Sequence, residues 1–184
     1  MPATTSERAF TPKEAAALSG LSERRVRKEI EHRVLKGGEP PRLGFSALLY
    51  LAALGRIGTE LPLELRRRIF LAIEEGGGTR SVAVADLLRL ELEPVVDELR
   101  EKVERFERWK RKLVSAPEIM GGETVFPGSR LTVRHVGEIL ERGESPEVLF
   151  EDYPELTDED LEFAPLFVRA YPRVGRPPRR QVVD

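Results

Sequence analysis

The sequence predicts a mainly α-helical chain with short β segments. Apolar residues recur at three- and four-residue spacing over much of its length, and Ser, Thr, Pro and Gly stand at the ends of these stretches, where helix caps are expected. Residues 117–134 depart from this pattern, because glycines and a Pro-Gly pair separate short β-favouring runs, which indicates a hairpin leading into a helix. We expect an N-terminal unit at residues 9–57, a connector at 58–113, a C-terminal unit at 114–171 and a tail at 172–184.

Two short helices separated by a glycine turn open the N-terminal unit. Thr11 is the predicted N-cap of the first helix, and Glu14 stands at the third helical position, where it completes a capping box. Gly20 ends this helix and Ser22 caps the second. The outward face of the second helix carries four cations, Arg24, Arg25, Arg27 and Lys28.

A two-stranded wing is predicted next, with residues 34–36 pairing with 42–45, and Ser46 is expected to cap a third helix at 47–54. This order resembles the winged helix-turn-helix of MerR-type regulators. The resemblance implies that the second helix enters the major groove of DNA while Lys36 and Arg42 on the wing contact phosphates. A solvated helix face is the usual alternative for such a charge run. We favour DNA, because the cations fall on the second helix; the candidate DNA-binding residues are Thr11, Ser22, Arg24, Arg25, Arg27, Lys28, Lys36 and Arg42.

The connector combines two amphipathic helices with a possible strand. Residues 61–75 have helical periodicity, and the three consecutive arginines at 66–68 are interpreted as a solvated face. Residues 81–92 alternate as in a half-buried strand, although 85–89 also fit a helix. A long helix is expected over residues 93–113, with Trp109 packing against the C-terminal unit.

The segment PEIMGGETVFPGSRLTVR, residues 117–134, resembles the signature of the family called domain of unknown function 433, roughly P-x-I-x-G-G-x-P-V-I-x-G-T-R-I-P-V. The sequence DYPELTDED at residues 152–160 extends the resemblance. Members of that family look like antitoxins of toxin–antitoxin pairs, so the resemblance implies a PIN-type ribonuclease toxin as partner. The matching positions are Pro117, Ile119, Gly121, Gly122, Val125, Gly128, Arg130 and Val133, whereas Thr124, Ser129 and Thr132 depart from the signature.

Three helices are expected after the hairpin, at residues 133–142, 146–153 and 157–170. The last is more apolar than one small domain needs, which indicates a partner surface. We expect a homodimer, with Val125, Leu131, Val133 and Leu161 at its interface. The candidate toxin-binding residues are Leu166, Phe167, Tyr171, Arg173, Arg176, Arg179 and Arg180.

The tail is too rich in proline, glycine and arginine to fold alone. The tail is either solvated or a nonspecific aid to nucleic-acid binding. A third possibility follows from the resemblance: its arginines pair with the carboxylates in the active site of the implied toxin and displace the metal from that site. The charge distribution fits partners at both ends, since Lys and Arg outnumber Asp and Glu by 10 to 6 in residues 1–56 and by 4 to 1 in 171–184. Acidic residues prevail by 13 to 4 in residues 115–170.

Composition argues against several other classes of protein. The chain of 184 residues has no cysteine and two histidines far apart, so we expect no metal centre, no cofactor and no enzyme. No signal peptide or membrane span is evident, and a cytoplasmic location is expected. The predicted function is a type II antitoxin that inhibits a PIN-type ribonuclease and binds its operator DNA. The alternative is a stand-alone MerR-like regulator whose C-terminal unit senses a protein or a small molecule.

Overall fold

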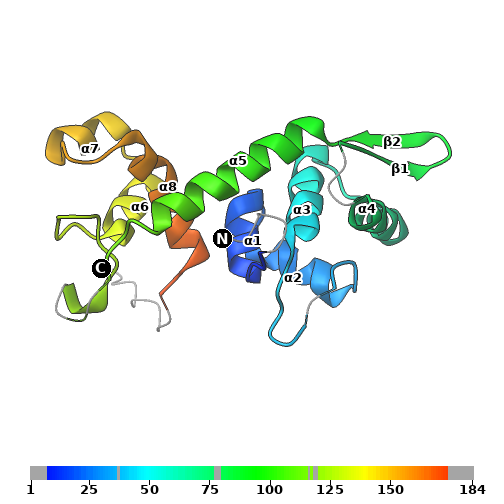
Figure 1. Ribbon diagram of the computed structural model, residues 1–184, viewed down its shortest axis with the longest axis horizontal. Helices are drawn as coiled ribbons and strands as arrows, with labels where there is room; N and C mark the ends of the chain where they lie inside the picture. Colours follow the sequence, from blue (N-terminus) through cyan, green and yellow to red (C-terminus); the bar gives the residue numbers. More distant parts are fainter. Residues whose placement is uncertain (1–7, 37, 77–79, 116, 118–119, 174–184) are drawn as a thin grey trace, which may run out of the picture.

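The computed structural model describes residues 8–36, 38–76, 80–115, 117 and 120–173. Figure 1 shows an elongated molecule in which one long helix, α5 (Glu93–Lys110), runs between the N-terminal and the C-terminal helices. Helices make up most of the described chain, which confirms the predicted mainly α-helical class. Within these residues no helix has both the length and the apolar character that crossing a bilayer would require.

The first two helices are α1 (Pro12–Ser19) and α2 (Glu23–Glu31). Their predicted caps are confirmed: the Glu14 N–H donates to Thr11 Oγ1, and the Thr11 N–H donates to the Glu14 carboxylate. Gly20 ends α1 at a φ of 77°, in the left-handed region that glycine adopts at little cost. Ser22 then caps α2 by accepting a hydrogen bond from the N–H of Arg25.

The predicted wing is wrong for the described residues between α2 and α3. Leu43 instead exchanges two backbone hydrogen bonds with Phe10, each 2.8 Å long. The N–H groups of Val34 and Leu35 donate to the carbonyl of Glu29 and so continue the end of α2. Burial is the physical reason, because Leu43, Val34 and Leu35 are all core residues and a projecting wing would expose them.

Helices α3 (Phe45–Ile57) and α4 (Leu63–Glu75) complete the N-terminal core. The predicted cap Ser46 is wrong, because Gly44 is the N-cap and Phe45 is buried as the first helical residue. Pro62 precedes α4 in an extended conformation and sets its start two residues after the predicted position. Most of α3 is buried, and its core residues include Leu48, Leu49, Tyr50 and Leu51.

A β-hairpin follows α4, formed by β1 (Ser81–Ala85) and β2 (Leu88–Glu91). The single strand predicted over residues 81–92 is therefore wrong in its middle, where Asp86 and Leu87 form the turn. The predicted alternation is present in β1, whose Val82 and Val84 are buried on the side that meets α4. In Figure 1 the hairpin projects from one end of the molecule.

Helix α5 connects the two units, and its apolar stripe is buried along its whole length. The indole Nε1–H of Trp109 donates to Asp160 Oδ1 at 2.7 Å. The Trp109 ring lies 5.8 Å from that of Phe163 and 6.2 Å from that of Phe167, measured between ring centroids. The expectation that Trp109 packs against the C-terminal unit is confirmed.

The predicted hairpin of the C-terminal unit is present as a set of isolated bridges rather than as strands. Val125 bridges Val114 on one side and Thr132 on the other. Gly128 adopts a φ of 72° in the turn between the paired segments. The glycine turn before it, Met120–Gly122, is a short 3-10 helix, while residues 118–119 of the predicted hairpin lie outside the described residues.

The last three helices are α6 (Val133–Glu141), α7 (Pro146–Asp152) and α8 (Asp158–Ala170). Thr132 is the N-cap of α6 and Thr157 that of α8, where it forms a capping box with Asp160. Helices α6 and α8 lie very close together at Gly137, whose missing side chain faces the backbone of Ala164. Helix α8 also contacts α1 and α5, so the N-terminal and C-terminal units pack directly against each other.

Candidate functional site

The strongest candidate site is the outward face of α2. Its position follows from the local sequence, since Gly20 and Ser22 turn the chain between α1 and α2. Arg24, Arg27 and Lys28 are exposed, and a groove of about 760 Å³ runs along this face as far as His32. Arg27 pairs with Glu23 one turn earlier, at 2.7 Å, whereas no ion pair engages Arg24 or Lys28 within the described residues.

Arg25 differs from the other three cations because it points toward the core. Its Nε lies 3.2 Å from Oε1 of Glu29, and its Nη1 lies 3.4 Å from Oε1 of Glu60. The Arg25 side chain is 23% exposed. We therefore interpret Arg25 as a residue that positions α2, although the sequence grouped it with the DNA-binding candidates.

Glu29 is fully buried on the inner face of α2 and joins three helices. Its Oε1 accepts a hydrogen bond from Arg66 Nη1 of α4 at 2.5 Å, and its Oε2 accepts one from the Tyr50 hydroxyl of α3 at 3.0 Å. A buried carboxylate without partners would be strongly destabilising, so this arrangement depends on all of them. Burial, followed by the negative charge of Glu29, raises the pKa of Tyr50 above its usual range, and the phenol stays a neutral donor.

The arginines at 66–68 are not one solvated face, so this prediction is wrong for its first member. Arg66 is buried at 6% exposure and bonds both Glu29 and the carbonyl of Leu61. Arg67 is half-buried and donates to the carbonyl of His32, just after α2. Arg68 alone is exposed.

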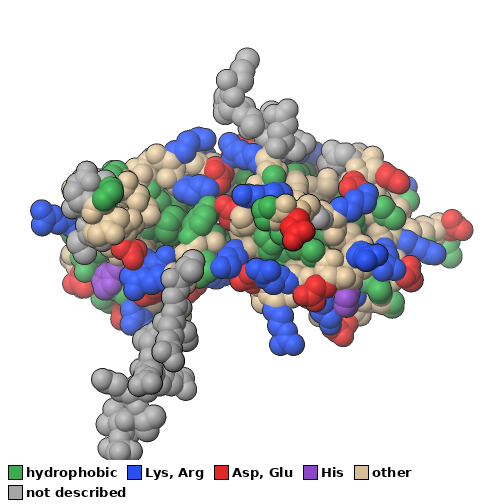
Figure 2. All heavy atoms as spheres, turned by 90° about the horizontal axis from the view of Figure 1, so that it is seen from below, with side chains coloured by type: hydrophobic (Ala, Val, Ile, Leu, Met, Phe, Trp, Pro, Cys, Tyr) green, Lys and Arg blue, Asp and Glu red, His purple; other side chains and the backbone are tan. Residues whose placement is uncertain are grey.

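The remaining DNA-binding candidates differ in exposure and in the partners of their side chains. Thr11 and Ser22 have their hydroxyl oxygens engaged as helix caps. Lys36 is exposed and pairs with Glu74 at 2.9 Å, and Arg42 is exposed in the loop before α3. Figure 2, which views the molecule from below, shows Lys and Arg side chains spread over the whole face with acidic ones among them.

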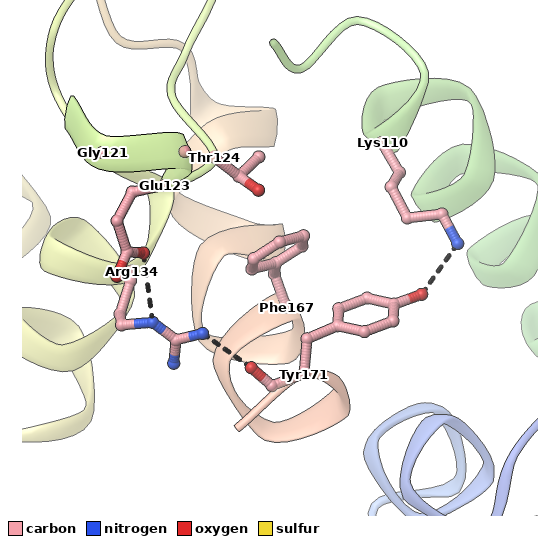
Figure 3. Close-up of a pocket in the computed structure, with 8 residues that line it drawn as sticks. Lys110, Gly121, Glu123, Thr124, Arg134, Phe167 and Tyr171 are labelled. Carbon is pink, nitrogen blue, oxygen red and sulfur yellow. Dashed lines mark hydrogen bonds and ion pairs between the residues drawn. The ribbon is translucent and has the colours of Figure 1, made fainter. Parts of the chain in front are cut away.

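A second candidate site is a pocket of about 610 Å³ beside the glycine turn (Figure 3). Gly121 and Gly122 line one side, and Lys110, Arg134 and Tyr171 line the others. Both glycines have positive φ values, 67° and 85°, which lets the backbone form this wall without strain.

Each cation of this pocket has a carboxylate nearby. Arg134 Nε lies 3.6 Å from a Glu123 oxygen without a hydrogen bond, and its Nη2 donates to the carbonyl of Tyr171. Lys110 donates to Glu107 at 2.7 Å and to the Tyr171 hydroxyl at 2.8 Å. These charges largely cancel, so the pocket offers polar contacts rather than a strong field for an anion.

Tyr171 also connects this pocket to the N-terminal unit. Its hydroxyl donates to Glu14 Oε1 at 2.6 Å, across 157 positions of sequence. Burial would raise the pKa of Glu14, but hydrogen bonds from Tyr171 and Thr11 outweigh it and lower that pKa below its usual value of 4.5. Burial and the contact with Glu14 raise the pKa of Tyr171.

The predicted partner surfaces of the C-terminal unit are mostly interior, which corrects the interpretation of α8. Its apolar residues are covered by α1, α5 and α6 of the same chain. Leu131 and Tyr171 are half-buried, and exposed Arg173 pairs with Glu123 at 2.9 Å. Arg176, Arg179 and Arg180 lie outside the described residues. The buried members are the dimerisation candidates Val125, Val133 and Leu161 and the toxin-binding candidates Leu166 and Phe167.

Comparison with known proteins confirms one resemblance. Residues 113–168 match the family model described as "Protein of unknown function (DUF433)", which covers the glycine turn and α6 to most of α8. The chain is also 26% identical to "Uncharacterized protein y4eO" of Sinorhizobium fredii (strain NBRC 101917 / NGR234), in an alignment that spans 89% of this chain and 81% of that protein. No solved structure matches the chain.

The sequence interpretation missed Glu29, Tyr50 and Arg66, which set the position of α2. A signal for Glu29 was present, because it stands three residues after Val26 and thus on the inner face of the helix. A comparable signal was present for Arg66, which stands three residues before Ile69 and seven before Ile73 and thus on the inner face of α4.

Proposed function

We propose that this chain is the antitoxin of a type II toxin–antitoxin pair in the cytoplasm. It binds operator DNA through α2 and a PIN-type ribonuclease toxin through its C-terminal unit and tail. The observation that carries the DNA-binding role is an exposed basic helix whose inner face is attached to α3 and α4 by one buried carboxylate. The DUF433 match supports the antitoxin role through the resemblance of that family to antitoxins. The proposal includes no catalytic step and no cofactor.

The arrangement of α2 suits the major groove of DNA. The exposed residues Arg24, Arg27 and Lys28 lie one helical turn or less apart, so one groove face can contact all three. A recognition helix has to keep its orientation while its charged face is desolvated, and the contacts of Glu29 with Tyr50 and Arg66 supply that rigidity. Because Glu29 also holds Arg25, we assign Arg25 to positioning and not to base contact.

Phosphate contacts are assigned to residues beside α2. Lys36 and Arg42 are exposed on the segment between α2 and α3 and reach outward without a paired wing. Lys36 must leave Glu74 to contact a phosphate, which costs little because the Lys36 side chain is 73% exposed. Contacts of this kind fix the register of the helix on DNA and make affinity dependent on salt.

The toxin-binding role rests on Tyr171 and the arginines that follow it. The Arg173 side chain is 69% exposed and its partner Glu123 is partly exposed, so a toxin carboxylate can compete for this guanidinium. Phe167 supports Tyr171 from the core, since the two rings are 4.9 Å apart, and Leu166 is a buried residue of the same helix. The toxin therefore meets the tail and the rim of the glycine-turn pocket rather than the apolar face of α8.

The DNA-binding role is tested by mobility shift with two duplexes of equal length, one from the region upstream of the coding sequence and one unrelated. We expect Arg24→Ala and Lys28→Ala each to weaken binding to the upstream duplex. Lys36→Ala and Arg42→Ala, each of which removes an assigned phosphate contact, should each lower the slope of log affinity against log salt by about 0.9. Arg68→Ala is the matched control, because Arg68 is also an exposed arginine but lies on α4. Unchanged binding for both α2 variants contradicts the proposal.

The antitoxin role is tested separately. The reading frame adjacent to that of this chain is expressed alone and then with this chain, and we expect toxicity that co-expression relieves. A version of this chain ending at Pro172 should relieve it poorly if the tail arginines neutralise the toxin. Full relief by this shortened chain assigns inhibition to the folded unit instead.

A stand-alone regulator that senses a small molecule is the second candidate function. The specific observation in its favour is the pocket of about 610 Å³ that Lys110, Arg134 and Tyr171 line in the C-terminal unit. A harmless neighbouring gene product, together with an operator affinity that changes when a metabolite extract is added, would favour this function over the antitoxin.

A further inference from the structure

The hairpin β1–β2 has one strand, β2, that is mostly exposed. Leu87 at its turn is 100% exposed and Leu88 beside it is 39% exposed. Helix α4 packs against β1, whereas β2 pairs with β1 alone among the described elements. Two-stranded hairpins are marginal by themselves, and a free edge strand offers a template for pairing with another chain.

The outward hydrogen-bonding groups of β2 can be identified from its pairing. The N–H of Leu92 donates to the carbonyl of Arg80 at 2.7 Å, so Leu92 points its backbone groups toward the β1 side. Backbone direction alternates along an antiparallel strand, so Leu90 also points toward β1. Arg89 and Glu91 therefore direct their N–H and C=O groups outward, away from β1.

Arg89 and Glu91, the two outward-facing residues, are complementary in charge to the same two residues of a second copy. If two copies of β2 pair antiparallel around a two-fold axis at Leu90, Arg89 of one copy lies opposite Glu91 of the other, and the reverse holds on the other side of the axis. In this register Arg89 and Glu91 form the pairs that exchange backbone hydrogen bonds, as their outward groups require. Both side chains are exposed, and Arg89 donates a hydrogen bond to the Ser81 hydroxyl at 3.1 Å but has no ion pair among the described residues.

The same register covers the exposed leucines of the turn. Leu87 of one copy lies three residues before the axis, so it comes beside residue 93 of the other copy, where α5 begins. Pro94 in the first turn of α5 is exposed and supplies apolar surface at that place. The turn of each hairpin thus contacts the base of the other, and both ends of the interface bury a leucine.

We propose that this chain forms a two-fold dimer through β2, with the two hairpins joined into one four-stranded antiparallel sheet. The occupant of the free edge is a second copy of the chain. DNA is a poorer partner for this edge, because residues 81–91 contain Asp86 and Glu91 against the single cation Arg89. The inference does not rest on the proposed function, and it replaces the interior residues first assigned to dimerisation.

A charge swap measured by analytical ultracentrifugation tests the pairing on the full chain without DNA. We expect a wild-type monomer–dimer equilibrium. Arg89→Glu and Glu91→Arg should each raise the dissociation constant about tenfold or more, because each variant places two like-charged pairs opposite one another. An equimolar mixture of the two variants restores opposite charges at both pairs and should form a mixed dimer as tight as the wild type.

Controls separate this interface from a general effect of charge. Arg108→Glu and Glu101→Arg make the same changes at exposed positions of α5 and should leave the equilibrium unchanged. Leu87→Ser should weaken the dimer without lowering the thermal midpoint measured at concentrations at which the wild type is monomeric, since Leu87 is 100% exposed in the single chain. A wild-type chain that stays monomeric at every concentration overturns the inference, as does a mixture of the two swap variants that fails to pair.

Discussion

Removal of the Arg66 guanidinium should destabilise the fold by leaving the Glu29 carboxylate buried with too few partners. In Arg66→Met the methylenes that pack in the core are retained, while the bond to Oε1 at 2.5 Å is lost. Breaking a buried ion pair in this way costs about 3–5 kcal/mol, and the remaining contacts with Tyr50 and Arg25 place the expected cost at the lower end, about 3 kcal/mol. For a chain of this size that corresponds to a fall in the thermal midpoint of about 6–12 °C.

The same reasoning predicts a rescue. Glu29→Gln removes the buried charge but keeps an oxygen that can accept the hydrogen bond of the Tyr50 hydroxyl. The double variant Glu29→Gln/Arg66→Met contains neither buried charge, so it should be more stable than Arg66→Met alone by about 1–2 kcal/mol. If Glu29→Gln restores stability that Arg66→Met has lost, the loss came from the unpaired buried charge of Glu29.

The measurement is urea unfolding of each variant, followed by far-ultraviolet circular dichroism and by Trp109 fluorescence. Trp109 lies against α8, so agreement of the two signals also tests whether the two units unfold together. Arg68→Met is the matched control and should change stability by less than about 0.5 kcal/mol, because its side chain is exposed. If Arg66→Met unfolds like Arg68→Met, or if the double variant is weaker than either single one, the account of Glu29 is incorrect.

Two further predictions concern the packing between helices. Gly137→Ala should destabilise the chain by about 1–3 kcal/mol despite the better helix propensity of alanine, because the added Cβ would lie 2.5 Å from the Ala164 carbonyl oxygen. Gly55→Ala is the control for urea unfolding, since its Cβ would meet the flexible Leu21 side chain at 3.4 Å and the Ser19 carbonyl oxygen at 3.8 Å, an ordinary contact distance. Tyr171→Phe should lower the free energy of unfolding by about 1–2 kcal/mol at neutral pH, because the hydrogen bond to Glu14 is lost. The lowered pKa of Glu14 gives stability that is present above the unfolded-state pKa of 4.5 and is lost as the pH falls through the pKa of Glu14 in the folded protein. The variant should therefore lose less stability on acidification than the wild type does. The thermal midpoints of the wild type and of Tyr171→Phe, measured from pH 3 to 7, check this prediction. Two parallel curves of midpoint against pH would contradict it.

Local signals in the sequence predicted most of the helices because their physical causes are local. The capping boxes of Thr11 and Thr157 involve partners three residues away, and the apolar stripe of α5 is visible as periodicity. The glycine turn was also predictable, since positive φ values at Gly121 and Gly122 are a property of that residue type. Features of this kind need no knowledge of the tertiary structure.

Features that depend on distant partners were missed. A wing was predicted at residues 42–45 from composition, but Leu43 pairs with Phe10, 33 positions earlier. The candidate site depends in the same way on Arg66, whose partner Glu29 is 37 positions away. Helical spacing places Arg66 on the same face as Ile69 and Ile73, but only the placement of α2 beside α4 supplies Glu29 as its partner.

The charge distribution along the chain was the most persuasive signal for separate partners, and the structure changes its meaning. The acidic start of α8 faces the basic end of α5, where Arg105 pairs with Glu162 at 2.5 Å and Lys112 pairs with Glu159 at 3.1 Å. These pairs are partly exposed and contribute little net stability. The aromatic contacts of Trp109 hold α5 and α8 together, and the charges select the relative alignment of the two helices.

An acidic segment that is neutralised within its own chain is not free to bind a second copy. Dimerisation therefore needs a surface whose charges remain unpaired, and among the described residues β2 has Arg89 without an ion pair and Glu91 exposed beside it. Arg24 and Lys28 of α2, which are exposed and have no ion pair among the described residues, meet the same condition for DNA. In this chain, charged side chains indicate a partner surface only where no opposite charge of the same chain pairs with them. Such unpaired charges are present on α2 and β2, whereas the more strongly charged α8 is paired with α5.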